Sequence, residues 1–204
     1  MTQLSRRSVL GLAAAATAAP LALRLPAHAA PATGFDLRTD AWTHVNAGRP
    51  DMSYWTAPAD DRTARDAVHV GLLQQPWPWR SFVRFPLSAV AGSTIESVGF
   101  QARIASKSLL NGRVELWHVA DIDPAVALTW NNTNSTATWR TGLGSDPGTG
   151  PALSYGSGSL LTAVQEAVAR QASHISFGLR NSVENTVNWK TLDRDAVSLL
   201  IFTA

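Results

Sequence analysis

The feature that most constrains the fold is an alternation of apolar and polar residues with a period of two, which recurs along the chain. In the stretch SVGFQARIA, residues 97–105, apolar side chains fall at every second position, and these are Val98, Phe100, Ala102 and Ile104. Because successive side chains of a strand point to opposite faces, this pattern is typical of a β-strand with one buried face. Similar alternation recurs in residues 81–87, 113–119 and 174–179. The sequence therefore predicts many short strands.

Helical periodicity stands out in one segment, SLLTAVQEAVARQ, residues 159–171. Leu161, Val164 and Val168 would share one face of this helix, and Ser159 would cap it. The last apolar run, residues 196–202, is apolar on both faces, as expected of a central strand that is covered on each side. Gly- and Pro-rich turns separate the strands. Together these patterns predict an all-β fold, a jelly-roll β-sandwich with one short helix.

The first 29 residues have the pattern of a twin-arginine signal peptide. The pair Arg6-Arg7 precedes an apolar run, and Ala27-His28-Ala29 offers small residues at the positions that an export peptidase reads. We therefore expect residues 1–29 to be a cleaved signal and residues 30–204 to form a single domain. The mature protein is expected to be secreted and extracellular.

The charge balance of the expected mature chain argues against two classes of partner. Loss of the signal leaves 14 of the 17 basic residues, whereas all 15 acidic residues remain. With no basic stripe left, the sequence predicts neither nucleic acid nor a membrane as a partner. The absence of cysteine excludes disulfides and thiolate metal sites.

Several segments resemble one known family in their order and spacing. They are RSFVRFPLS at residues 80–88, TWNN at residues 129–132, and FGLRN with the following WK within residues 177–190. Over residues 36–204 the chain resembles the DNRLRE (disaggregatase-related) domains of secreted bacterial proteins. That resemblance implies a jelly-roll fold and extracellular modules of proteins that bind or process polysaccharide, some of them counted as carbohydrate-binding modules. It implies no shared set of catalytic residues.

A first candidate sugar-binding site is the stretch that holds Trp77, Trp79 and Arg80. Pro76 and Pro78 flank the tryptophans, and because proline cannot donate a ladder hydrogen bond, we expect both indoles on a loop. An indole can cover the C–H face of a sugar ring, and an arginine can donate paired hydrogen bonds to hydroxyls or a uronate. The alternative is that the two rings plug one end of the sandwich.

A second candidate site combines outward-facing positions of two strands. Arg103 and Gln101 lie on one of them, and Trp117 and Glu115 lie on the other. If the two strands are neighbours, these side chains form a shallow binding platform on a sheet face. The alternative is an ordinary solvated face. Large aromatic side chains often fill the cores of sandwiches. Because Trp130 and Trp189 lie in the TWNN and WK segments that carry the family resemblance, we interpret both as structural residues.

Catalytic and metal-binding patterns are weak. The four histidines beyond the signal peptide do not have metal-ligand spacing, and His118 alternates with core residues, which favours a core histidine over a catalytic base. Asp121 and Asp123 precede Pro124 as in a turn. No cofactor is evident, although a structural calcium ion bound by aspartates remains open, and the candidate ligands are Asp40, Asp51, Asp60 and Asp61.

The sequence thus favours a secreted, non-catalytic module that binds polysaccharide. Two alternatives stay open. One is a structural or protein-interaction domain of the cell surface or extracellular matrix, with a protein partner that the sequence does not identify. The other is a small polysaccharide-active enzyme.

Overall fold

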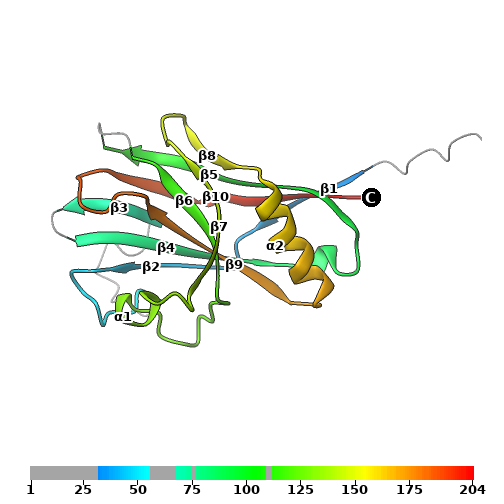
Figure 1. Cartoon of the computed structure of the whole chain (residues 1–204), viewed down its shortest axis with the longest axis horizontal. Coiled ribbons are helices and arrows are strands. Elements are labelled where there is room, and N and C mark those ends of the chain that lie inside the picture. Colours follow the sequence, from blue (N-terminus) through cyan, green and yellow to red (C-terminus); the bar gives the residue numbers. More distant parts are fainter. Residues whose placement is uncertain (1–31, 56–67, 75–76, 109–111) are drawn as a thin grey trace, which may run out of the picture.

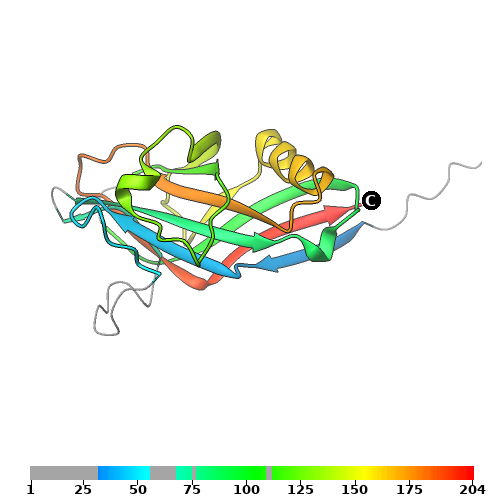
Figure 2. The same cartoon turned by 90° about the horizontal axis from the view of Figure 1, so that it is seen from below.

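The computed structural model describes residues 32–55, 68–74, 77–108 and 112–204, which form long strands that run side by side with short helices (Figure 1, Figure 2). The strands are β1 (Thr33–Arg38), β2 (Ala41–Asn46), β3 (Val68–Gln74), β4 (Trp77–Pro86), β5 (Ile95–Lys107), β6 (Val114–Val119), β7 (Trp139–Asp146), β8 (Ala152–Tyr155), β9 (His174–Asn181) and β10 (Trp189–Thr203). The helices are η2 (Ser88–Val90), α1 (Trp130–Thr133) and α2 (Gly158–Ala169).

Strand pairing divides the sandwich into two layers that are joined along one side. The hydrogen-bonded order is β7-β6-β9-β4-β3-β10-β5-β8, with β2 added to β4 and β1 added to β10. We call β2, β4, β9, β6 and β7 the β4 sheet, and β1, β10, β5 and β8 the β10 sheet. β3 pairs with both β4 and β10, while a hydrogen bond from the Ser154 amide of β8 to Asp146 of β7 links the opposite edges. The expected all-β sandwich is confirmed.

The main core lies between the two sheets and follows the alternation in the sequence. Phe85 of β4, Phe177 of β9 and Phe100 of β5 are fully buried, and their ring centroids lie 5.9–6.0 Å apart in edge-on contacts. Edge-on packing is the arrangement that aromatic quadrupoles favour. Each such ring contributes about 1.5–3 kcal/mol by leaving water. These three side chains therefore fix the spacing of the layers.

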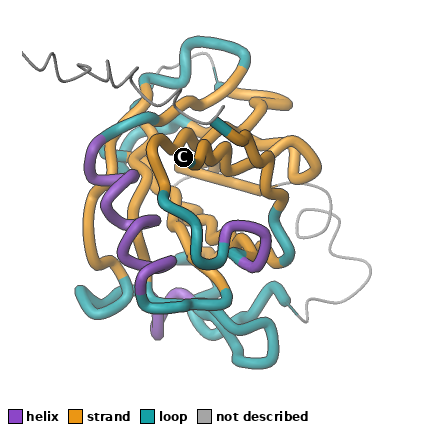
Figure 3. The backbone as a smooth tube through the Cα atoms, turned by 90° about the vertical axis from the view of Figure 1, so that its right-hand side faces the viewer, coloured by secondary structure: helices purple, strands orange, loops and turns teal. Residues whose placement is uncertain are grey.

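Helix α2 packs beside the strands, as Figure 3 shows, and it begins at Gly158, one residue before the periodic segment. Its N-cap is Ser157, whose Oγ accepts the Leu160 amide at 3.1 Å, so the prediction of Ser159 as the cap was wrong. Leu160 is buried and Leu161 only half-buried, which corrects the predicted apolar face by one position. Val164 and Val168 are buried as predicted.

The terminal strand β10 is central in its sheet, but its two faces differ. Val197, Leu199 and Ile201 are buried in the core, whereas Phe202 on the other face is 44% exposed. The predicted cover on both faces was wrong for Phe202, whose side chain points away from the core into solvent. Phe202 instead packs on Gly34 of the neighbouring strand β1.

The predicted signal peptide, residues 1–29, lies outside the described residues. Because β1 begins at Thr33, removal of residues 1–29 leaves every described strand intact. Among the helices of the described residues, none has the length and apolarity needed to cross a bilayer.

A cluster of histidines and aromatic rings fills the interior where β2, β3 and β4 meet. His44 is completely buried, and its ring centroid lies 4.5 Å from Tyr54, 5.3 Å from His69 and 4.8 Å from Trp79. Within the described part of the chain, neither ring nitrogen of His44 has a hydrogen-bond partner. Burial, with a smaller contribution from nearby His69, lowers the pKa of His44 to about 3. The imidazole is therefore neutral and acts as an apolar ring at neutral pH.

His44 should make the protein sensitive to acid. Its pKa is about 3 in the folded protein and 6.5 in the unfolded chain, so between these values the unfolded chain binds the extra proton. Stability is thus retained above pH 6.5 and falls by about 1.4 kcal/mol per pH unit as the pH drops toward 3. Urea unfolding at pH 7, 5.5 and 4.5 should show a shallower loss for His44→Phe than for the wild type. Equal losses in the two proteins would contradict this assignment.

Candidate functional site

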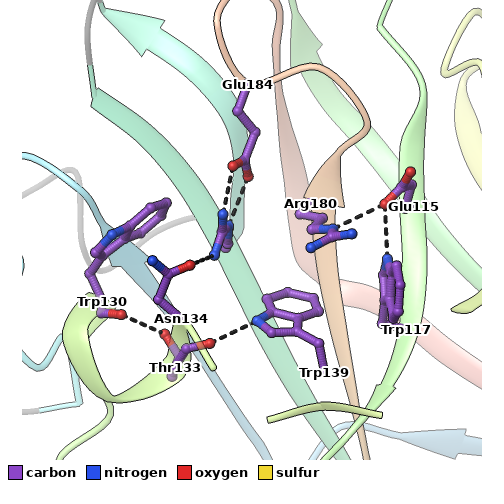
Figure 4. Close-up of polar contacts among 9 residues, drawn as sticks. Glu115, Trp117, Trp130, Thr133, Asn134, Trp139, Arg180 and Glu184 are labelled. Carbon is purple, nitrogen blue, oxygen red and sulfur yellow. Dashed lines mark hydrogen bonds and ion pairs between the residues drawn. The ribbon is translucent and has the colours of Figure 1, made fainter. Parts of the chain in front are cut away.

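The outer face of the β4 sheet carries a row of alternating tryptophan and arginine side chains (Figure 4). The guanidinium carbon of Arg80 lies 4.2 Å from the ring centroid of Trp130 and 5.6 Å from that of Trp139. The guanidinium carbon of Arg180 lies 5.2 Å from Trp139 and 4.3 Å from Trp117. All four distances are within the range of about 6 Å for cation–π attraction. We call the set the Trp–Arg stack, and its order is Trp130, Arg80, Trp139, Arg180 and Trp117.

The register of three paired strands creates room for the central ring of the stack. Gly178 of β9 lies between Phe82 of β4 and Trp117 of β6. A Cβ atom at Gly178 would lie 2.6 Å from Cζ3 of Trp139, so the indole occupies the space that any side chain would need. Trp139 packs there against Phe82 at 5.3 Å between ring centroids. A second, smaller core therefore lies under the stack, and its buried members are Val45, Phe82, Val119, Ile122 and Trp139.

Arg80 is a buried anchor of this surface. Its Nε and Nη2 donate to the two carboxylate oxygens of Glu184 at 2.8 and 2.6 Å, and its Nη1 donates to Oδ1 of Asn134 at 2.9 Å. Glu184 comes from the β9–β10 loop and Asn134 from the end of α1, so one side chain joins two connections that are distant in sequence. A bidentate arginine–carboxylate pair is strong and fixes the geometry of both partners.

At the Trp117 end of the stack, the carboxylate of Glu115 accepts two hydrogen bonds. Oε2 of Glu115 accepts from Nε of Arg180 and from the indole nitrogen of Trp117, both at 3.0 Å. In the centre, the indole nitrogen of Trp139 donates to the Thr133 carbonyl at 2.8 Å. Trp117, Glu115 and Arg180 are half-buried, so their edges remain in contact with solvent.

Helix α1 carries Trp130, which forms the end of the stack opposite Trp117. A capping box fixes the start of this helix: Thr129 accepts the Asn132 amide, and Asn132 accepts the Thr129 amide. Trp130 is half-exposed in this position. As predicted, Trp130 has a structural role, because it packs against the smaller core and contacts Arg80, while part of its side chain stays exposed to solvent.

Trp77 and Trp79 lie in strand β4, so the prediction that they are on a loop was wrong. Pro78 is tolerated near the start of the strand, where its carbonyl accepts the Ala47 amide at 3.1 Å and its lack of an N–H does not break the ladder. Trp77 is 47% exposed and lies against Gly48. Trp79 points inward to the histidine cluster. The two indoles therefore do not form one surface, and Arg80 points to the opposite face.

The second predicted site is also corrected by the strand order. Arg103 and Gln101 lie on β5, which pairs with β10 and β8, whereas Trp117 and Glu115 lie on β6, which pairs with β7 and β9. The two strands belong to different sheets, so the predicted platform does not form. Arg103 is exposed and forms an ion pair with Asp193 of β10.

The remaining sequence candidates have structural partners where they are described. Asp40 forms an ion pair with Arg84 at 3.0 Å and lies 2.9 Å from Nε2 of His174, and Asp51 accepts from Asn131. Asp60 and Asp61 lie outside the described residues. Within the described ranges, no group of three or more histidines and carboxylates is arranged to hold a metal ion.

One pocket among the described residues is separate from this surface. It has a volume of about 560 Å³ and lies between η2 and the C-terminal end of α2. Its lining consists of small, apolar or uncharged polar side chains such as Ser93, Gln165 and Ala169. Because it contains neither an aromatic ring nor a charged group, it offers little chemistry for specific recognition.

The sequence was compared with protein-family models and with curated proteins, and neither comparison found a match. The chemistry of the Trp–Arg stack must therefore be judged from its own side chains. Half-exposed indoles can pack against the apolar face of a ligand, and the carboxylate, amide and guanidinium groups beside them can hydrogen-bond to its polar atoms.

Replacement of Gly178 by alanine should disrupt the stack. The new Cβ would overlap the ring of Trp139, and such overpacking costs about 1–3 kcal/mol. Gly142→Ala is the matched control, because its Cβ would make an ordinary 3.7 Å contact with Trp117. Chemical denaturation should show a clear loss for the first variant and a smaller change for the second. Equal stability of the two variants would contradict the packing described here.

Arg80→Lys should destabilise the protein although the charge is kept. Lysine cannot reproduce the paired bonds to Glu184, and loss of buried charged hydrogen bonds costs about 1.5–3 kcal/mol. The control is Arg103→Lys at the exposed pair with Asp193, which should change stability by less than about 1 kcal/mol. Thermal unfolding of both variants provides the test. Equal unfolding temperatures for Arg80→Lys and Arg103→Lys would show that the paired bonds of Arg80 do not stabilise the fold.

Proposed function

We propose that this protein is a secreted, non-catalytic polysaccharide-binding module that uses the Trp–Arg stack as its binding surface. The observation that carries the proposal is the presence of two half-exposed indoles, Trp117 and Trp130, on one sheet face whose polar neighbours are already held by hydrogen bonds. Sugar rings present flat C–H faces and a rim of hydroxyls, and such a surface matches both features.

The rigidity of the surface also favours sugar binding. Glu115, Glu184 and Asn134 are each bonded to an arginine of the stack, so their remaining lone pairs and amide protons have fixed directions. A preorganised site loses little side-chain entropy when a flexible polymer binds. An open sheet face, in contrast to a closed cavity, also lets a long chain extend beyond the site.

Two expectations from the sequence agree with this proposal. The chain resembles the DNRLRE domains of secreted proteins that bind or process polysaccharide, and its N-terminal pattern predicts export. The segments that carry the resemblance include Arg80, Trp130 and Arg180, which are three of the five members of the stack.

Pull-down of the chain without residues 1–29 on a panel of insoluble and soluble polysaccharides tests the proposal. Wild type should bind at least one polysaccharide, and Trp117→Ala and Trp130→Ala should each weaken binding on the order of tenfold, as expected for a central aromatic contact. Trp77→Ala is the matched control, since that ring is exposed but lies outside the stack. Circular dichroism should confirm that all three variants are folded.

The same pull-down samples distinguish the proposed binding surface from another binding site, an enzyme and a protein-interaction domain. Loss of binding only in Trp77→Ala would move the site away from the stack. Release of soluble sugar would identify an enzyme instead of a binding module. No binding and no release across the panel would contradict the proposal and favour a protein-interaction domain of the cell surface.

A further inference from the structure

A small polar pocket lies apart from the Trp–Arg stack, where β6, the start of β9 and the end of α2 meet. Its volume is about 100 Å³, and none of the five stack residues lines it. Its polar lining comes from four places in the sequence: β6 and the residues that follow it, β7, the end of α2, and β9. These residues are His118, Asp121, Arg140, Arg170, His174 and Ser176.

The arginines of this pocket differ from those elsewhere on the same sheet. Arg80, Arg84 and Arg180 each bind a carboxylate at 3.0 Å or less. The side chain of Arg140, in contrast, forms no hydrogen bond or ion pair with any residue of the described ranges. Arg170 has only a 3.7 Å contact with Glu166, and both side chains are more than half exposed. Two guanidinium groups therefore retain donors for a further partner.

His118 adds an imidazole to the same pocket. It is half-buried, and in the described part of the chain neither of its ring nitrogens is hydrogen-bonded. Burial lowers the pKa of His118, the charges of Arg140 and Arg170 lower it further, and Glu166 acts weakly in the opposite direction. Both guanidinium groups thus lie close enough to His118 for their charges to act on it.

Several other polar atoms of the pocket already have partners. Oδ1 of Asp121 accepts the hydroxyl of Ser176 at 2.7 Å, and Ser176 in turn accepts the Ile122 amide. The negative charge of Asp121 also contributes to the raised pKa of nearby Arg84. His174 contacts Asp40 through one ring nitrogen and Ser173 through the other. Among the described residues, the lining atoms without such a partner are the Arg140 guanidinium, the ring nitrogens of His118 and Oδ2 of Asp121.

We propose that this pocket binds a single tetrahedral oxyanion, a sulfate or phosphate group that is either free or esterified on a larger molecule. Arg140 and Arg170 supply the charge, and His118 donates from the β6 side. The volume of about 100 Å³ corresponds to about three water molecules at roughly 30 Å³ each, which suits one oxyanion but not a whole sugar residue with its neighbours. Charge-assisted hydrogen bonds from arginine are the usual means of recognising such groups.

The inference does not rest on the polysaccharide proposal, because the pocket and the stack share no residue. A test with an inorganic ion therefore separates the failure of one from the failure of the other. A sulfated polymer then distinguishes a free ion from an esterified group.

The experiment follows the histidine ring protons by NMR in the chain without residues 1–29, at constant ionic strength, with sodium sulfate or phosphate against sodium chloride. An anion bound between two guanidinium groups offsets their charge, so sulfate should raise the pKa of His118, whereas chloride should not. Arg140→Gln and Arg170→Gln should each weaken sulfate binding on the order of tenfold, since each removes a charge-assisted contact. The matched control is Arg113→Gln, an exposed arginine whose partner is Ser145 and which should bind as the wild type does.

The outcomes are distinct. A response of His118 that is lost in Arg140→Gln and kept in Arg113→Gln supports the site. If dextran sulfate then binds more tightly than sulfate while plain dextran does not, the anion is carried on a polymer. If dextran sulfate is no better, the ligand is the free ion. No response to saturating sulfate and phosphate, or equal responses in Arg140→Gln and wild type, would overturn the proposal.

Discussion

The packing of Trp139 on Gly178 is the contact on which the outer face of the β4 sheet depends. An exposed sheet face in a sandwich needs no cover of its own, and here a glycine in the middle of β9 allows an indole to lie directly on the backbone. That indole buries Phe82 beneath it and separates the two arginines that flank it. Everything on this face, from the direction of Arg80 to the position of α1, is arranged around that ring.

Arginine has two structural roles in this arrangement. Its planar guanidinium group contacts the face of an indole, while the N–H groups at its edge bind a carboxylate. Arg80 and Arg180 both do this, each with a glutamate, so the row of rings alternates with a row of ion pairs. Lysine would carry the same charge, but it has no planar group that could lie between two indoles and form paired hydrogen bonds with a carboxylate. The result is a face that combines aromatic edges with fixed polar groups.

Much of the architecture could be predicted from the sequence because it follows local alternation. Phe100 was predicted on the buried face of its strand and is fully buried, as are Phe85 and Phe177 of the alternating segments 81–87 and 174–179. Pro78 was misleading, because proline argues against a sheet interior but not against the start of a strand. Phe202 was misread because periodicity cannot tell whether a second layer covers a sheet.

The site could not be predicted from the sequence because it depends on which strands pair. Trp117 was predicted as a site residue, but its partners Arg180 and Trp139 come from other strands that only the register places beside it. One local signal indicated the position of the site, which is Gly178 within the predicted strand of residues 174–179. Glycine within a strand often marks the close approach of another group. Arg80 was predicted to face a ligand, whereas its partner Glu184 lies 104 residues away in the chain.

The central claim is that the half-exposed indoles of the stack are a ligand-binding surface and not only a structural one. The most direct measurement is a nitrogen–proton NMR spectrum of the tryptophan indole groups, recorded with and without soluble oligosaccharides of the polysaccharide that the protein retains. The account predicts shifts of the Trp117 and Trp130 indole signals, with the Trp189 signal unchanged. Shifts confined to Trp77, or no change in any indole signal at saturating oligosaccharide, would contradict it.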